Sequence, residues 1–199
     1  MAKKLTIALC ILFGFSWSTY AQEINFGEYG NYTLSVGQLN QNTDLDFGQL
    51  VSGSGSSSDI PITEAKVIKI TGVKYIDVIV QVNAATELYL NGNTGNSGVA
   101  SKTISWTLKA AYANNKGTPS VGQAKFISNI SNNSFITQFP ILERQNRPPG
   151  PPPAPPTNAF DQSKVEETAY LYLYGTIPSV GNVDAGSYSS EISVTINYD

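Results

Sequence analysis

The chain contains no histidine, and its one cysteine, Cys10, lies close to the N-terminus. General acid–base and nucleophilic catalysis draw mostly on His, Cys or paired carboxylates. Only 14% of the residues are charged. Asp44 and Asp46 are two positions apart, which in a strand indicates an exposed polar face beside a turn. We therefore predict no catalytic, cofactor-binding or metal-binding residues, and a protein that is not an enzyme.

Long apolar runs are also scarce, since the only one extends from Leu5 to Trp17 behind two lysines. Basic residues, an apolar stretch and small residues before Ala21 form the pattern of a secretory signal peptide. The run of about thirteen residues falls short of the roughly twenty that cross a bilayer. We expect residues 1–21 to be removed and residues 22–199 to form one exported domain.

Cleavage would remove two of the twelve basic residues and none of the fifteen acidic ones, leaving a net charge of −5. This charge excludes the basic footprint of a nucleic-acid-binding protein. Cleavage would also remove Cys10, so the exported domain would depend on its hydrophobic core rather than on disulfides. No second long apolar run follows, which predicts no integral membrane segment after cleavage.

Short segments in which apolar and polar residues alternate make up most of the remaining chain. Alternation with a period of two is typical of half-buried strands, and Gly, Asn and Ser clusters separate the segments. Strands are predicted at residues 31–36, 45–50, 60–62, 66–72, 76–82, 87–90, 103–112, 124–128, 134–142, 168–175 and 192–198. Residues 22–30 either begin the first strand or form a loose extension before it. The prediction is an all-β, Ig-like sandwich of short antiparallel strands, with Trp106 in the core of a central strand.

Two segments interrupt this series. Residues 52–59 are rich in Ser and Gly and are expected to form a flexible loop. Residues 144–157 carry a proline-rich insert, which favours polyproline II and cannot join a sheet. The insert is expected to be a solvated spacer or surface loop, with recognition by an aromatic groove as the alternative.

The C-terminal strand has the most regular alternation, with its apolar side chains on one face. These side chains belong to Ile192, Val194, Ile196 and Tyr198. Such a strand must pair, because an unpaired edge invites other strands. Two partners remain open: the chain's own first strand, or a strand of a neighbouring molecule.

Three features together resemble the pilin-like domains of exported bacterial proteins. They are Leu45-Asp46-Phe47-Gly48, the consecutive strands 66–72 and 76–82, and the alternating C-terminus. The resemblance includes chaperone–usher pilus subunits and the spore coat protein U group. It is strongest for a related secreted family of unknown function with an L-D-F-G strand and a G-x-Y…Y ending. Pilus subunits carry a glycine fourteen residues from the end and a penultimate aromatic, matched here by Gly186 and Tyr198.

The resemblance implies an exported structural or adhesive protein of the cell surface. In pilins an incomplete sandwich leaves a groove beside the C-terminal strand, which a periplasmic chaperone fills before the N-terminal extension of the next subunit. The partners implied are therefore like subunits and a chaperone, and Ile24 and Phe26 would be the donor side chains. The assembly strand implied comprises Gly186, Tyr188, Ile192, Val194, Ile196 and Tyr198.

A tyrosine stripe supports a second function. Tyr170, Tyr172 and Tyr174 share one face of the predicted strand 168–175. If exposed, they form a platform for sugar rings or a partner; the alternative is that they pack beneath the proline insert or against the second sheet. The alternative function is a secreted, non-catalytic carbohydrate-binding module that recognises surface glycans.

Overall fold

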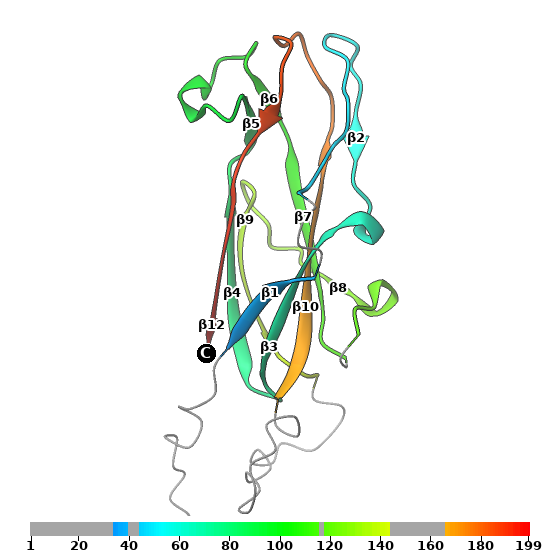
Figure 1. Ribbon diagram of the computed structural model, residues 1–199, viewed down its shortest axis with the longest axis vertical. Helices are drawn as coiled ribbons and strands as arrows, with labels where there is room; N and C mark the ends of the chain where they lie inside the picture. The colour runs from blue at the N-terminus through cyan, green and yellow to red at the C-terminus, as the bar shows by residue number, and fades with distance from the viewer. Residues whose placement is uncertain (1–33, 40–43, 116–117, 144–165) are drawn as a thin grey trace, which may run out of the picture. The chain divides into compact units, whose positions relative to one another are not determined.

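The computed structural model describes residues 34–39, 44–115, 118–143 and 166–199 (Figure 1). All of them belong to the unit Tyr32–Asp199. The predicted signal peptide, the donor side chains Ile24 and Phe26, and the proline-rich insert lie outside the described residues. The described part is all-β, as predicted, and contains no α-helix.

Twelve strands and three short 3-10 helices follow one another along the described residues. The strands are β1 (Ser35–Gln38), β2 (Ser58–Asp59), β3 (Lys66–Val73), β4 (Asp77–Ala84), β5 (Glu87–Leu90), β6 (Thr103–Ser105), β7 (Thr107–Ala113), β8 (Lys125–Phe126), β9 (Ser134–Pro140), β10 (Glu166–Ile177), β11 (Tyr188–Ser189) and β12 (Ile192–Tyr198). The 3-10 helices are η2 (Ile62–Glu64), η3 (Thr94–Asn96) and η4 (Val121–Gln123).

The strands form three antiparallel sheets in a sandwich-like arrangement. The large sheet has the order β1-β3-β10-β7-β8, and β2 pairs with the end of β10. Two three-stranded sheets, β12-β4-β9 and β11-β5-β6, complete the fold. The main core forms where the β4 sheet faces the large sheet: Val78, Val80 and Val82 of β4 are completely buried together with Ala169 and Leu171 of β10.

The predicted strand 103–112 is interrupted, and β6 and β7 belong to different sheets. The break falls at Trp106, which is buried as predicted and donates its indole N–H to the Ala85 carbonyl at 2.8 Å. Asn133 holds the backbone on both sides of this break. Its side chain accepts from the Leu108 amide at 2.8 Å and donates to the carbonyls of Ala85 and Trp106, each at 3.0 Å.

The prediction of a strand at residues 45–50 is wrong. The Asp46 carboxylate accepts a hydrogen bond from the Gly48 amide at 2.8 Å, and Gly48 has a φ of +74°, so the backbone turns where a strand would continue. Leu45 and Phe47 nevertheless pack on the core, and the Phe47 ring meets Trp106 edge-on with the centroids 5.9 Å apart. The L-D-F-G motif is therefore an anchored turn.

Residues 52–55 form turns and residues 58–59 form β2, whereas residues 60–62 are not the predicted strand. The Gly53 amide donates to the Gly181 carbonyl and the Val180 amide to the Ser56 carbonyl, each at 2.8 Å, so the segment pairs with residues 180–183. The Ser52 hydroxyl adds a bond to the Val183 carbonyl at 2.7 Å. Beyond β2, Pro61 lacks an amide for a ladder, and the chain enters η2.

Candidate assembly site

The C-terminal strand pairs with β4, in a register from Ile192 opposite Ala84 to Tyr198 opposite Val78. The chain's own first strand does not occupy this edge, because β1 pairs with β3 in the other sheet. Among the described residues, no strand pairs with the second edge of β12. One edge of the terminal strand is therefore satisfied within the fold, and the other is open.

The ladder also determines which backbone groups reach the open edge. The Asp199 amide donates to the Asp77 carbonyl at 3.0 Å, so this pair is a hydrogen-bonded one. Pairs alternate along an antiparallel ladder, and Ile192, Val194, Ile196 and Tyr198 therefore direct their N–H and C=O groups away from β4. The residues whose side chains face the core are thus the ones whose backbone faces the open edge.

The edge strand of the large sheet, β1, also has an inward side chain that is not covered. Val36 lies opposite Ile70 of β3, so both side chains are on the inner face of the sheet. Ile70 is 0% exposed, whereas Val36 is 51% exposed. Ile192, Val194 and Ile196 are likewise only half-buried, although they pack against the main core. We call this margin between β1 and β12 the open seam.

Tyr198 closes one end of the open seam. Its hydroxyl accepts a hydrogen bond from the Val73 amide of β3 at 3.0 Å, which joins the two sheets. The contact depends on Gly72, because a Cβ at that position would lie 2.6 Å from the hydroxyl oxygen and 3.1 Å from Cδ1 of Leu34. Burial raises the pKa of Tyr198, the Val73 hydrogen bond opposes this, and the charge of Glu166 raises it further.

The opposite margin, between β8 and β9, is closed. Its inward side chains are buried, with Ile127 9%, Phe135 5% and Phe139 2% exposed. The ring of Tyr112 stacks on Phe139 at a centroid distance of 4.2 Å, and the Asn129 amide group donates to the Ile136 carbonyl at 2.9 Å. The open seam is therefore a local property of one margin of the sandwich.

Gly186 and Tyr188 were predicted as part of the assembly strand, but the structure places them before β12, against β5. A Cβ on Gly186 would collide with Cδ1 of Leu90, and Tyr188 pairs with the same leucine. The Tyr188 hydroxyl donates to the Asp184 carbonyl at 2.7 Å. Burial, and secondarily the charge of Asp184, raise the pKa of Tyr188. Both residues fix the turn that precedes the edge strand.

The tyrosine stripe shares one face of β10, as predicted, but it is not exposed. Tyr170, Tyr172 and Tyr174 are 4%, 1% and 8% exposed, in a second core on the outer face of the large sheet. Residues such as Ile60, Ala65 and Val121 contribute to this core. Of the two alternatives, the structure shows burial and not a surface platform, and residues of the segments around η2 and η4 contribute to the core around the rings.

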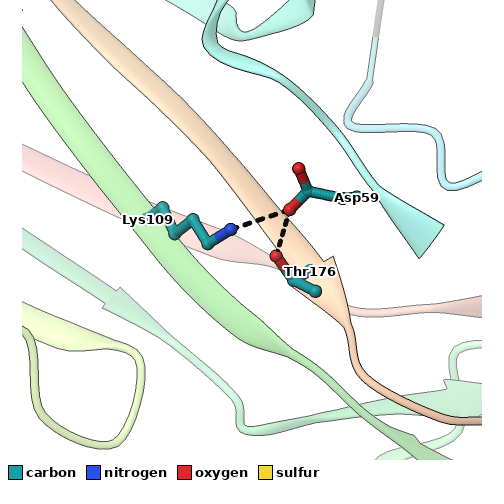
Figure 2. Close-up of polar contacts among 3 residues, drawn as sticks. All are labelled: Asp59, Lys109 and Thr176. Atoms are coloured by element: carbon teal, nitrogen blue, oxygen red, sulfur yellow. Dashed lines mark hydrogen bonds and ion pairs between the residues drawn. The ribbon is translucent and has the colours of Figure 1, made fainter. Parts of the chain in front are cut away.

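A polar cluster that the sequence analysis missed lies at the end of β10 (Figure 2). Asp59 accepts hydrogen bonds from Lys109 Nζ at 2.7 Å and from the Thr176 hydroxyl. The hydrogen bond from Lys109, and then that from Thr176, lower the pKa of Asp59. These contacts fasten β2 to β10 and β7. The described residues hold no group of three or more His, Cys, Asp or Glu side chains that could bind a metal ion, and no helix among them is long and apolar enough to cross a membrane.

Comparisons with known proteins found one solved structure that is similar to the chain. No protein-family model and no curated protein matches the chain. The chain is similar to part of a chaperone–tip adhesin complex of CFA/I fimbriae biogenesis, with 14% sequence identity and a TM-score of 0.40. The similarity covers 86% of this chain and 44% of that chain, so this protein spans less than half the length of the chain that it matches.

Proposed function

We propose that the protein is an exported structural or adhesive component of the cell surface, without catalytic activity, that assembles by strand addition at the open seam. The observation that carries the proposal is the exposure of Val36. Its side chain is on the inner face of a sheet, opposite the fully buried Ile70, yet half of its surface is accessible. Among the described residues, no strand covers a side chain in that position.

An added strand would satisfy the open edge of β12 and would cover inward side chains of both β12 and β1. It would pair with the backbone groups that β12 directs outward, while its alternate side chains would cover Val36 and the inner face of β12. The proposed donor is residues 22–30 of another copy, with Ile24 and Phe26 entering the seam. Donation from copy to copy is head-to-tail and builds a filament. A periplasmic chaperone is the proposed partner of the seam before assembly.

Deletion of residues 22–30 tests the donor. The deleted chain should fold and remain monomeric, whereas the chain 22–199 should form ladders or fibres. Light scattering after size exclusion, together with electron microscopy, measures both. Filaments of normal length from the deleted chain would contradict the proposed donor.

A pair of matched substitutions tests the acceptor. Val36 and Ile136 are β-branched residues on edge strands at opposite margins, with exposed fractions of 51% and 58%. Both Val36→Asp and Ile136→Asp should leave stability within about 0.5 kcal/mol of the unsubstituted protein, because both sites are exposed. Only Val36→Asp should abolish assembly. Equal loss of assembly from the two variants would mean that the open seam is not the acceptor.

A further inference from the structure

The open seam is short, because Tyr198 crosses it. The ring lies against Gly72, and its hydroxyl accepts a hydrogen bond from the Val73 amide of the opposite sheet. Ile192, Val194 and Ile196 have aliphatic side chains, which cannot form such a hydrogen bond, and these side chains remain half-buried. The part of β12 that can receive a strand therefore extends from Ile192 to Ile196.

The length of this stretch limits what a strand can place in it. Inward side chains of a strand with a period of two are about 6.6 Å apart, so two of them lie within the roughly 13 Å from Ile192 to Ile196, and a third would fall at the end beside the Tyr198 ring. A donor that placed another inward side chain beyond Ile196 would meet the Tyr198 ring. The seam thus selects for length as well as for apolar character.

The sequence of the proposed donor has a matching length. Ile24 and Phe26 are its two apolar residues in alternate positions, and the next alternate position is Glu28. A carboxylate cannot be buried without a partner at acceptable cost, so Glu28 must lie outside the apolar part of the seam. A seam closed by Tyr198 requires no third apolar side chain from the donor.

We infer that Tyr198 is the residue that sets the length of the acceptor seam, and that the seam takes a strand with two inward apolar side chains, such as residues 23–27 of a second copy running parallel to β12 with Glu28 toward Tyr198. This inference rests on the proposed function and adds a specificity-determining residue to it. Tyr198 acts by occupying the space where a longer donor would continue.

Lengthening the donor tests the inference in the chain 22–199. Glu28→Val gives the donor a third inward apolar side chain. With Tyr198 intact, the association constant measured by sedimentation should change by less than about twofold. In a Tyr198→Val background the additional side chain has space, and Glu28→Val should strengthen association about tenfold, the value expected for one buried aliphatic side chain.

Tyr198→Phe is the matched control, because it keeps the ring and removes only the hydroxyl. Glu28→Val should again give no gain in this background. A gain of about tenfold while the aromatic ring is still in place, with Tyr198 intact or in the Tyr198→Phe background, would overturn the role of Tyr198 and leave strand addition intact. If Tyr198→Val does not fold, these two backgrounds still decide the question. Absence of association in the unsubstituted protein at every concentration would instead contradict the proposed function, and the inference with it.

Discussion

The two margins of the sandwich consist of similar antiparallel strands, but one margin is closed and the other is open. At the β8–β9 margin the chain passes directly from one sheet to the other, and Phe135 and Phe139 of β9 are buried. At the β1–β12 margin two strands far apart in sequence face each other, and Val36 is half exposed. Alternation alone therefore does not close a sandwich. Closure also requires a segment that covers the inward side chains, and the described chain provides one at only one margin.

The largest effect is expected from breaking the closed margin at Asn133. Asn133→Ala removes three hydrogen bonds and leaves the Leu108 amide and the Trp106 carbonyl without this buried partner. The free energy of unfolding should fall by about 3–5 kcal/mol in chemical denaturation. Asn132→Ala is the control, because Asn132 shares the positive φ but is exposed, so only about 1 kcal/mol of backbone strain is expected. Equal losses would show that backbone strain, and not the loss of the hydrogen bonds, accounts for the effect of Asn133→Ala.

A smaller effect is expected from opening the closed end of the seam at Gly72. Gly72→Ala places a Cβ 2.6 Å from the Tyr198 hydroxyl, so the ring must move away from β3. The expected loss is about 1–3 kcal/mol, measured by thermal or urea unfolding. Gly37→Ala in β1 has open space around the new Cβ and should change stability by less than about 0.5 kcal/mol. A neutral Gly72→Ala would mean that the sheets are not held together there.

The smallest effect is expected from the Tyr198 hydroxyl alone. Tyr198→Phe removes the hydrogen bond from the Val73 amide and should cost about 1 kcal/mol at neutral pH. Tyr188→Phe, whose hydroxyl bonds an exposed carbonyl, should cost less.

The contribution of Tyr198 should also depend on pH. Burial raises the pKa of Tyr198 above its ordinary 10.0, so the neutral phenol is favoured in the folded state. The resulting stability is fully present below the pKa of the unfolded chain and is lost as the pH rises through the higher pKa of the folded protein. Urea unfolding at about pH 8 and about pH 11 should show a weaker loss for Tyr198→Phe than for the unsubstituted protein. Identical pH dependence would exclude this role of the phenol.

The sequence predicted the regular strands well, because their signal is local. Residues 87–90 and 192–198 coincide with β5 and β12, and the apolar face of β12 faces the core as the alternation indicated. The partner of β12 was missed, since β4 lies more than a hundred residues earlier and pairing depends on the whole topology. The sequence predicts a strand where the turn Asp46–Gly48 lies, because Leu45 and Phe47 are two positions apart and both pack on the core, as they would in a strand.

Burial was harder to predict than strand formation. Tyr170, Tyr172 and Tyr174 lie on one face as the alternation indicated, but a period of two does not reveal whether a second layer covers that face. Here residues around η2 and η4 provide the cover. The break at Trp106 was missed for a related reason, because it depends on the side chain of Asn133, which is distant in sequence.

On β12 the residues whose side chains face the core are also those whose backbone groups face the open edge, so an insertion or deletion would change both. A single-residue slip of β12 against β4 would turn Ser193, Thr195 and Asn197 toward the core and, at the same time, give the open edge a different set of amides. Both properties would be lost together, so the strand should tolerate no change in its residue count. The exposed turn around residues 181–187 carries no such alternation, so a change of one residue there would disturb its own contacts but would not turn the polar face of β12 toward the core.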